Sequence, residues 1–260
     1  MSAPAIAVSN LVKRFPLSRG IAEIVRQPFG RCWTTALDGL DLEVGQGEIF
    51  GLLGSNGAGK TTLLKILCTL VLPTEGSAAV AGHDVVQAPA SVRQAVGYCL
   101  DTERSFYFRL TGRQNLAFFA ALNNLESRHA ADRIAELTGM LGLGSAVDRL
   151  FMTYSKGMQQ KLGLIRALMS DPAVLLLDEP TKSLDPGAAA EFRRLIRNTL
   201  VDRFGKTILL VTHSLEDAAE CCDRVALMSQ GRISLRGTWA EVRGSVRNGG
   251  LPAQYSDSLS

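Results

Sequence analysis

The chain has 260 residues, of which 46% are hydrophobic and 20% charged, so it is long and apolar enough for one large domain and is not a disordered chain. Its net charge is +3, from 28 basic and 25 acidic residues, and this small excess gives no reason to expect nucleic acid as a partner. No apolar run approaches the ~20 residues needed to cross a bilayer, and the N-terminus lacks the pattern of a signal peptide. The sequence therefore predicts a cytosolic protein that would reach a membrane only through a partner.

Two strands and a long insertion are predicted in the first part of the chain. Residues 5–12 and 40–44 have the apolar pattern of strands. Between them, residues 16–35 are too long for a simple connection, and residues 21–26 are predicted to form a short helix. The arginines of this insertion favour a solvated surface, and contact with anionic lipid headgroups or with a partner is the alternative.

A glycine-rich loop follows at residues 54–62, whose sequence GSNGAGKTT fits the pattern G-x-x-x-x-G-K-[ST]. Residues 48–53 before it are typical of a buried strand and residues 63–70 after it of an apolar helix, which is the context that this motif requires. Glycines allow consecutive backbone N–H groups to surround phosphate oxygens at the positive end of a helix, so we expect a nucleoside triphosphate here rather than a glycine-rich turn with a solvated lysine. The residues predicted to hold it are Gly54, Ser55, Asn56, Gly57, Ala58, Gly59, Lys60, Thr61 and Thr62.

The middle of the chain is predicted to be helical and the last part to alternate strands with helices. Helical spacing occurs at residues 115–122, 128–141, 158–169, 186–200 and 215–222. Strand patterns occur at residues 76–85, 173–177, 207–212 and 225–228, and the last continues through a turn at Gln230 and Gly231 into residues 232–235. This order predicts an α/β fold with a mainly parallel sheet, divided into a core at 1–100 and 165–243 and a helical insert at about 101–164. Residues 244–260 are rich in Gly and Ser and are predicted to be a flexible tail.

The strand predicted at residues 173–177 ends at two carboxylates, Asp178 and Glu179, at the edge where open α/β sheets bind ligands. Asp178 would hold Mg²⁺ together with the Thr61 hydroxyl, and Lys60 would contact the β- and γ-phosphates. Glu179 would orient and deprotonate the attacking water. The alternative, in which the two carboxylates only cap the next helix, is less consistent with a phosphate loop upstream.

A histidine, His213, follows the next predicted strand at the same edge. A lone histidine is often structural, but this position would let it hydrogen-bond the γ-phosphate and help to hold the attacking water. We therefore group His213 with Glu179 and Lys60 as the predicted catalytic residues.

Four stretches in this order resemble the ATP-binding cassette (ABC) family, and the resemblance covers about residues 6–242. They are GSNGAGKTT, YSKGMQQK, LLLDEPTKSLDP and THSLEDA, which begin at Gly54, Tyr154, Leu175 and Thr212. The resemblance implies an ABC nucleotide-binding domain: a P-loop NTPase core with a mainly parallel sheet, an N-terminal antiparallel β subdomain and an inserted α-helical subdomain. It also implies ATP and Mg²⁺ as cofactors.

The resemblance assigns further roles. Ser155 and Gly157 keep the Ser-x-Gly pair that, in the family, contacts the γ-phosphate bound by the opposite subunit, and Asp185 lies in a loop that crosses the same interface. Lys156 and Met158 replace the Gly and Gln of the usual pattern, which puts the rate of hydrolysis in question.

Two positions are less closely defined by the family pattern. Asp101 stands where a glutamine is expected and would face Mg²⁺ or a water, with Glu103 as a nearby alternative. Phe15 is expected to stack on the adenine, with Trp33 as the alternative.

The resemblance implies an ATP-hydrolysing subunit of an ABC transporter. Segments 16–35 and 101–119 resemble bacterial exporters of the polysaccharide, antibiotic and lipid type. The expected partners are an integral-membrane permease and a second ABC ATPase subunit, in a homodimer or a heterodimer, at the inner face of the cell membrane. The alternatives are a soluble ABC ATPase that acts on ribosomes or DNA, and a weakly hydrolysing regulatory cassette.

Overall fold

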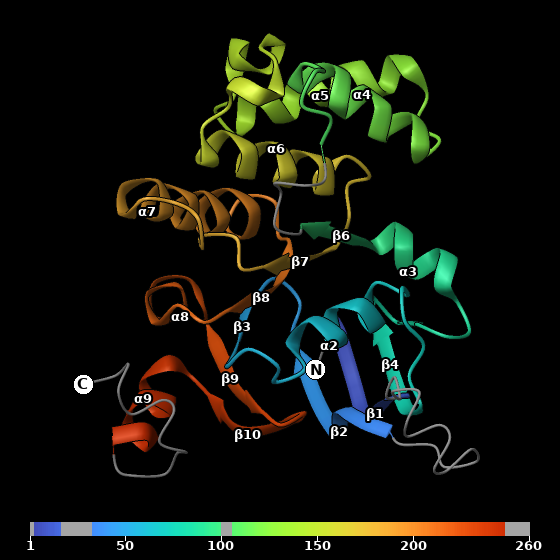
Figure 1. Ribbon diagram of the computed structural model, residues 1–260, viewed down its shortest axis with the longest axis vertical. Coiled ribbons are helices and arrows are strands. Elements are labelled where there is room, and N and C mark those ends of the chain that lie inside the picture. The colour runs from blue at the N-terminus through green and yellow to red at the C-terminus, as the bar shows by residue number, and fades with distance from the viewer. Residues whose placement is uncertain (1–2, 17–32, 100–105, 248–260) are drawn as a thin grey trace, which may run out of the picture.

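The computed structural model describes residues 3–16, 33–99 and 106–247. In this part of the chain a four-stranded sheet lies beside a six-stranded sheet, and a group of helices lies at one end (Figure 1). The helix predicted at residues 21–26 falls outside the described residues, as do Asp101 and Glu103.

The smaller sheet is antiparallel throughout and has the strand order β2-β1-β4-β5. Its strands are β1 (Ile6–Pro16), β2 (Trp33–Val44), β4 (Glu75–Val80) and β5 (His83–Asp84). This confirms the predicted N-terminal antiparallel β region. Strands β1 and β2 are longer than predicted, since they pair from Ile6 opposite Val44 to Pro16 opposite Trp33. The residues at the Pro16–Trp33 end are exposed and lack an apolar alternation, so the sequence pattern did not reveal this part of the strands.

The larger sheet has the order β10-β9-β3-β8-β7-β6 and is parallel except for the β9–β10 hairpin. Its strands are β3 (Ile49–Gly54), β6 (Val96–Cys99), β7 (Val174–Asp178), β8 (Thr207–Thr212), β9 (Arg224–Ser229) and β10 (Arg232–Gly237). Every residue of β3 and β8 is buried, as expected for central strands of a parallel sheet that is covered on both faces. The predicted mainly parallel sheet is confirmed.

Helices cover both faces of the larger sheet. Because side chains alternate along a strand, Leu175 and Leu177 of β7 pack with α6 (Lys156–Leu168) and α7 (Pro186–Arg194), while Val174 and Leu176 pack with α2 (Lys60–Leu67). Apolar residues of the smaller sheet join α2 in the same cluster, so α2 lies between the two sheets. The helix that follows the glycine-rich loop is therefore held rigidly from both sides.

The inserted helices gather beyond α6, at the top of Figure 1. They comprise α4 (Gly112–Leu122), α5 (Ser127–Met140) and two short 3₁₀ turns, Gly144–Asp148 and Phe151–Thr153. Helix α4 begins with a capping box, in which the Thr111 hydroxyl accepts from the Gln114 N–H and the Gln114 side chain accepts from the Thr111 N–H. The predicted α-helical insertion is confirmed.

The π-helical continuation of α7 at Leu195–Val201 and helix α8 (Leu215–Cys221) end within one residue of the prediction. Two further helices, α3 (Pro89–Ala95) and α9 (Trp239–Arg247), were not predicted from the sequence. Helix α9 continues past Gly244, where the sequence predicted a tail to begin. Its Val242 is buried against Val225 and Leu227 of β9, and this contact stabilises a helix that composition alone does not reveal.

Candidate nucleotide-binding site

The loop between β3 and α2 has a backbone that only glycine allows at two points. Gly59 precedes the first residue of α2 with φ 105°, and a Cβ there would lie 2.4 Å from the Ala36 carbonyl oxygen. A Cβ on Gly54 would lie 2.5 Å from the Met228 carbonyl oxygen. These close backbone approaches explain why the motif needs glycine at both positions.

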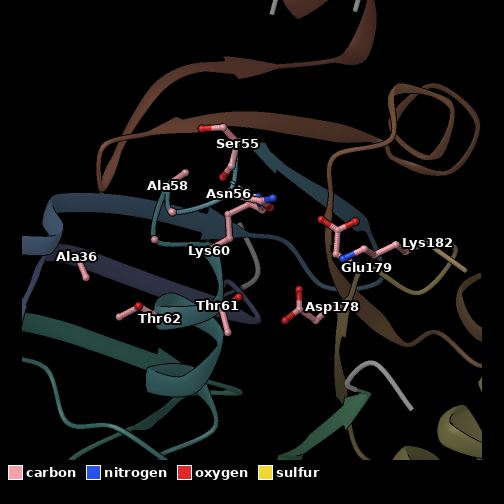
Figure 2. A pocket seen from close by; sticks show the side chains of 12 residues that line it. Ala36, Ser55, Asn56, Ala58, Lys60, Thr61, Thr62, Asp178, Glu179 and Lys182 are labelled. Carbon is pink, nitrogen blue, oxygen red and sulfur yellow. Dashed lines mark hydrogen bonds between the residues drawn. The ribbon is translucent and has the colours of Figure 1, made fainter. Parts of the chain in front are cut away.

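A cavity of about 360 Å³ lies between this loop and the end of β7 (Figure 2). Residues 55–62 form one wall, and Asp178, Glu179 and Lys182 form the other, with Ala36 of β2 at the far end. The structure thus brings together the loop and the two carboxylates that the sequence placed in one site. Ala36 and Lys182 also line the cavity, and the sequence analysis gave neither of them a role.

Lys60 is only 7% exposed, and its ammonium donates to the carbonyl oxygens of Gly54 and, at 3.1 Å, Ser55. Burial lowers the pKa of Lys60, while the negative charges of Glu179 and Asp178 oppose this shift. The lysine is therefore held inside the loop, facing two carboxylates.

Asp178 lies opposite Thr61. Burial and the neighbouring Glu179 raise the pKa of Asp178, and Lys60 and a hydrogen bond from the Thr61 hydroxyl oppose the increase. A carboxylate and a hydroxyl in hydrogen-bonding contact are hard oxygen donors that suit Mg²⁺. Among the described residues there is no cluster of three or more His, Cys, Asp and Glu that could hold a metal ion.

Glu179 has a left-handed backbone with φ 51°, which is unfavourable for a residue with a side chain. Its N–H donates to the Val211 carbonyl of β8 at 2.8 Å, and its Oε2 lies 2.5 Å from Nδ1 of His213. The side chain of His213 is 58% exposed and that of Glu179 is 16% exposed. The structure therefore joins these two predicted catalytic residues directly, across neighbouring strands.

The buried carboxylate of Asp217 accepts hydrogen bonds from three residues close to the site. It accepts from the hydroxyls of Thr181 at 2.5 Å and Thr212 at 3.0 Å, and from Arg193 of α7 at 3.1 Å. Thr181 follows the Asp178–Glu179 pair, and Thr212 precedes His213, so Asp217 holds both segments that carry the predicted catalytic residues. The sequence carries no signal for this network because its members are brought together only by the packing of α7 and α8.

Replacing Arg193 with methionine is expected to destabilise the fold by about 3–5 kcal/mol, because it leaves the fully buried Asp217 carboxylate without its charged partner. Urea unfolding would measure the change. Arg113→Met is the matched control, since the Arg113–Asp148 pair, at 2.7 Å, is about half exposed and such surface pairs contribute little to stability. Equal stability of the two variants would contradict the structural role of the Asp217 network.

Ser155 and Gly157 lie at a second cavity, of about 260 Å³. The Ser155 hydroxyl accepts from the Met158 N–H at 3.3 Å and caps α6. Asp185 caps α7 in the same way, by accepting from the Ala188 N–H at 3.0 Å, and Ala188 lines this second cavity. The two cavities share no lining residue, so these three residues are not brought together with the glycine-rich loop within one chain.

The two candidates for adenine stacking lie at the paired ends of β1 and β2. Phe15 is 37% exposed, with the Lys13 ammonium 4.9 Å from its ring centre, and Trp33 is 50% exposed. Neither lines the first cavity, so the choice between them stays a prediction. Asp101, predicted to face the metal, lies outside the described residues.

A family model described as "ABC transporter" matches residues 37–182, more than half of the chain. The chain belongs to the ABC transporter family. The resemblance carried by the four motifs is thus confirmed, and the chain is an ATP-binding domain of the ABC ATPases.

Relatives and solved structures agree with this assignment. DrrA of Streptomyces peucetius, a daunorubicin/doxorubicin resistance ATP-binding protein, is 40% identical over 227 residues, which are 87% of this chain and 68% of DrrA. The ABC transporter ATP-binding protein NatA of Bacillus subtilis (strain 168) is 36% identical over 254 residues, 98% of each chain. The fold matches cbiO1 from Clostridium perfringens with a TM-score of 0.78, 23% identity and 99% of each chain covered. It matches the ATP-binding cassette MJ0796 with a TM-score of 0.75 and 22% identity, over 90% of this chain and 98% of that one.

Proposed function

We propose that the chain is the ATP-hydrolysing subunit of an exporter and acts as a pair of cassettes bound to a membrane permease. The loop N–H groups and Lys60 bind the phosphates of ATP, and the Thr61 and Asp178 oxygens would hold Mg²⁺, which would offset the phosphate charge. Glu179 accepts a proton from the attacking water. His213, whose Nδ1 lies 2.5 Å from Glu179 Oε2, keeps the Glu179 side chain oriented and hydrogen-bonds the γ-phosphate.

The observation that carries the paired arrangement is the separation of the two cavities. The loop cavity opens at the start of α2, and the Ser155 cavity opens at the start of α6. These helices pack on opposite faces of the larger sheet, as Figure 1 also shows. Since both are anion-binding helix starts, they can hold the same triphosphate only if the second one comes from another chain.

Two chains in a head-to-tail pair would place the Ser155–Gly157 corner of each over the ATP held by the other. ATP then bridges the pair while its γ-phosphate is present, and hydrolysis releases the bridge. MJ0796, which has this fold, has been solved as a dimer in a post-hydrolysis state with ADP and Pi. Asp185 lies beside the second cavity through its cap of α7, and so would lie near the contact between the chains.

The helical region supports contact with a permease because it carries large exposed hydrophobic side chains. They are Tyr107, Phe108, Phe118, Leu122, Leu150 and Met152. No helix in the described ranges is long and apolar enough to span a membrane. The chain would therefore lie at the cytoplasmic face of the membrane, held by the permease. The names of DrrA and of the probable multidrug protein YbhF of Escherichia coli support a drug-like cargo.

Mixing two inactive variants tests the paired site. Lys60→Ala removes the phosphate contact of the loop but keeps the Ser155 corner. Ser155→Asp keeps the cap of α6, since Asp is also a good cap, but its carboxylate repels the γ-phosphate of the opposite chain. Each variant alone is expected to be inactive, and the mixture to recover part of the ATPase activity, because a mixed pair contains one intact site.

Two outcomes would contradict the paired site. Full activity of Ser155→Asp by itself would show that this corner does not face ATP. A mixture as inactive as its components, although both variants remain folded by circular dichroism, would show that identical chains do not complete one another's sites.

A further inference from the structure

Lys182 lines the nucleotide cavity, and neither the motifs nor the proposed function assign it a role. It lies in the turn after β7, where its N–H donates to the Glu179 carbonyl oxygen at 3.2 Å. The preceding Thr181 is anchored to the buried Asp217 at 2.5 Å. Because the turn is fixed at both points, the Lys182 side chain leaves the backbone in a defined direction.

That direction is into the cavity. Figure 2 shows the Lys182 side chain pointing toward Glu179 and Asp178, on the cavity wall that faces the loop. Lys161 and Lys206 each pair with a carboxylate, at 2.7 and 2.8 Å, whereas in the described part of the chain Lys182 makes no such pair. Its charge nevertheless reaches Asp178, where it opposes the effect of burial on the pKa of that carboxyl. The Lys182 ammonium thus lies close to the acidic end of the cavity, and it forms no salt bridge with another described residue.

The ends of the cavity differ in chemistry. Ala36 lies at the end opposite Lys182, near the strands of the smaller sheet, whereas Asp178, Glu179 and Lys182 share the other end. The terminal phosphate must approach Glu179 if this residue activates the attacking water, so it also approaches Lys182. Two carboxylates at that end repel a phosphate, and a second lysine offsets this repulsion.

We propose that Lys182 binds the terminal phosphate of ATP and makes the cavity favour the triphosphate over the diphosphate. This inference rests on the proposed function, since it requires ATP in this cavity. Lys60 is held against the loop, where it would contact the β- and γ-phosphates, and Lys182 supplies a second cation on the opposite wall. ADP, which lacks the terminal phosphate, does not reach it.

Calorimetric titration with Mg-AMPPNP, a non-hydrolysable ATP analogue, and with Mg-ADP separates these contacts. Lys182→Met is expected to weaken binding of AMPPNP roughly tenfold, as expected for a charge-assisted contact at a partly exposed site, and to leave ADP binding unchanged. Lys182→Arg, which keeps the charge, is expected to restore most of the preference. Lys65→Met is the matched control: Lys65 is an exposed lysine of α2 that does not line the cavity, and its loss should change neither affinity.

An equal loss of affinity for both nucleotides, or no loss for either, would overturn the assignment of Lys182. ADP binding also reports that the variant is folded, because Lys182 is exposed and outside the apolar core. Failure of the unaltered chain to bind either nucleotide would instead overturn the proposed function, so the two failures are distinguishable.

Discussion

Replacement of Glu179 by glutamine is expected to lower kcat for ATP hydrolysis by about 10²–10⁴-fold, the usual contribution of a general base. The amide keeps the size of the side chain and can still hydrogen-bond His213, but it cannot accept the proton of the attacking water. The left-handed backbone at Glu179, φ 51°, and its contact with β8 hold the residue at the cavity, so its position should survive the substitution. Phosphate release under saturating Mg-ATP is the measurement.

The same variant should retain ATP and accumulate as a dimer on gel filtration, because the bridging γ-phosphate is no longer removed. Glu136→Gln is the control, since Glu136 is an exposed residue of α5 far along the helical insertion. Normal turnover by Glu179→Gln would exclude Glu179 as the base. A monomer in saturating Mg-ATP would contradict the proposed pairing.

Lys60→Ala is expected to reduce turnover to background and to weaken ATP binding about 10–100-fold, since hydrogen bonds to charged groups contribute about 1.5–3 kcal/mol. The lysine is 7% exposed and lies within the loop, so solvent cannot replace it easily. The methionine of Lys60→Met fills nearly the same volume as lysine but carries no charge. The turnover of this variant should fall as far as that of Lys60→Ala, which separates the loss of charge from the loss of packing. Turnover close to normal in either variant would contradict the role of Lys60.

The nucleotide loop could be predicted because its information is local. A few consecutive residues between a strand and a helix determine the path of the backbone, and the glycines at 54 and 59 meet neighbouring carbonyls that tolerate no Cβ. Strands β3 and β8 could also be predicted from the sequence, since they are buried on both faces and consist of continuous apolar or small residues.

Other features needed contacts between distant residues. The Pro16 end of β1 and the Trp33 end of β2 are held by backbone pairing of exposed residues, and α9 is held by Val242 against β9, so neither leaves an apolar periodicity. Lys182 lies within the stretch LLLDEPTKSLDP, but only the turn anchored at Asp217 directs its side chain into the cavity.

By itself, the amino-acid sequence determined the class of fold, the nucleotide loop, the paired carboxylates and the family, because each depends on residues close together in the chain. The tertiary structure alone decided which carboxylate faces His213, that Asp217 joins Thr181, Thr212 and Arg193, and that the Ser155 cavity is separate from the loop cavity. The physical reason is that these arrangements arise from the order of strands in the larger sheet and the packing of helices on its two faces, which bring together residues that no local pattern connects.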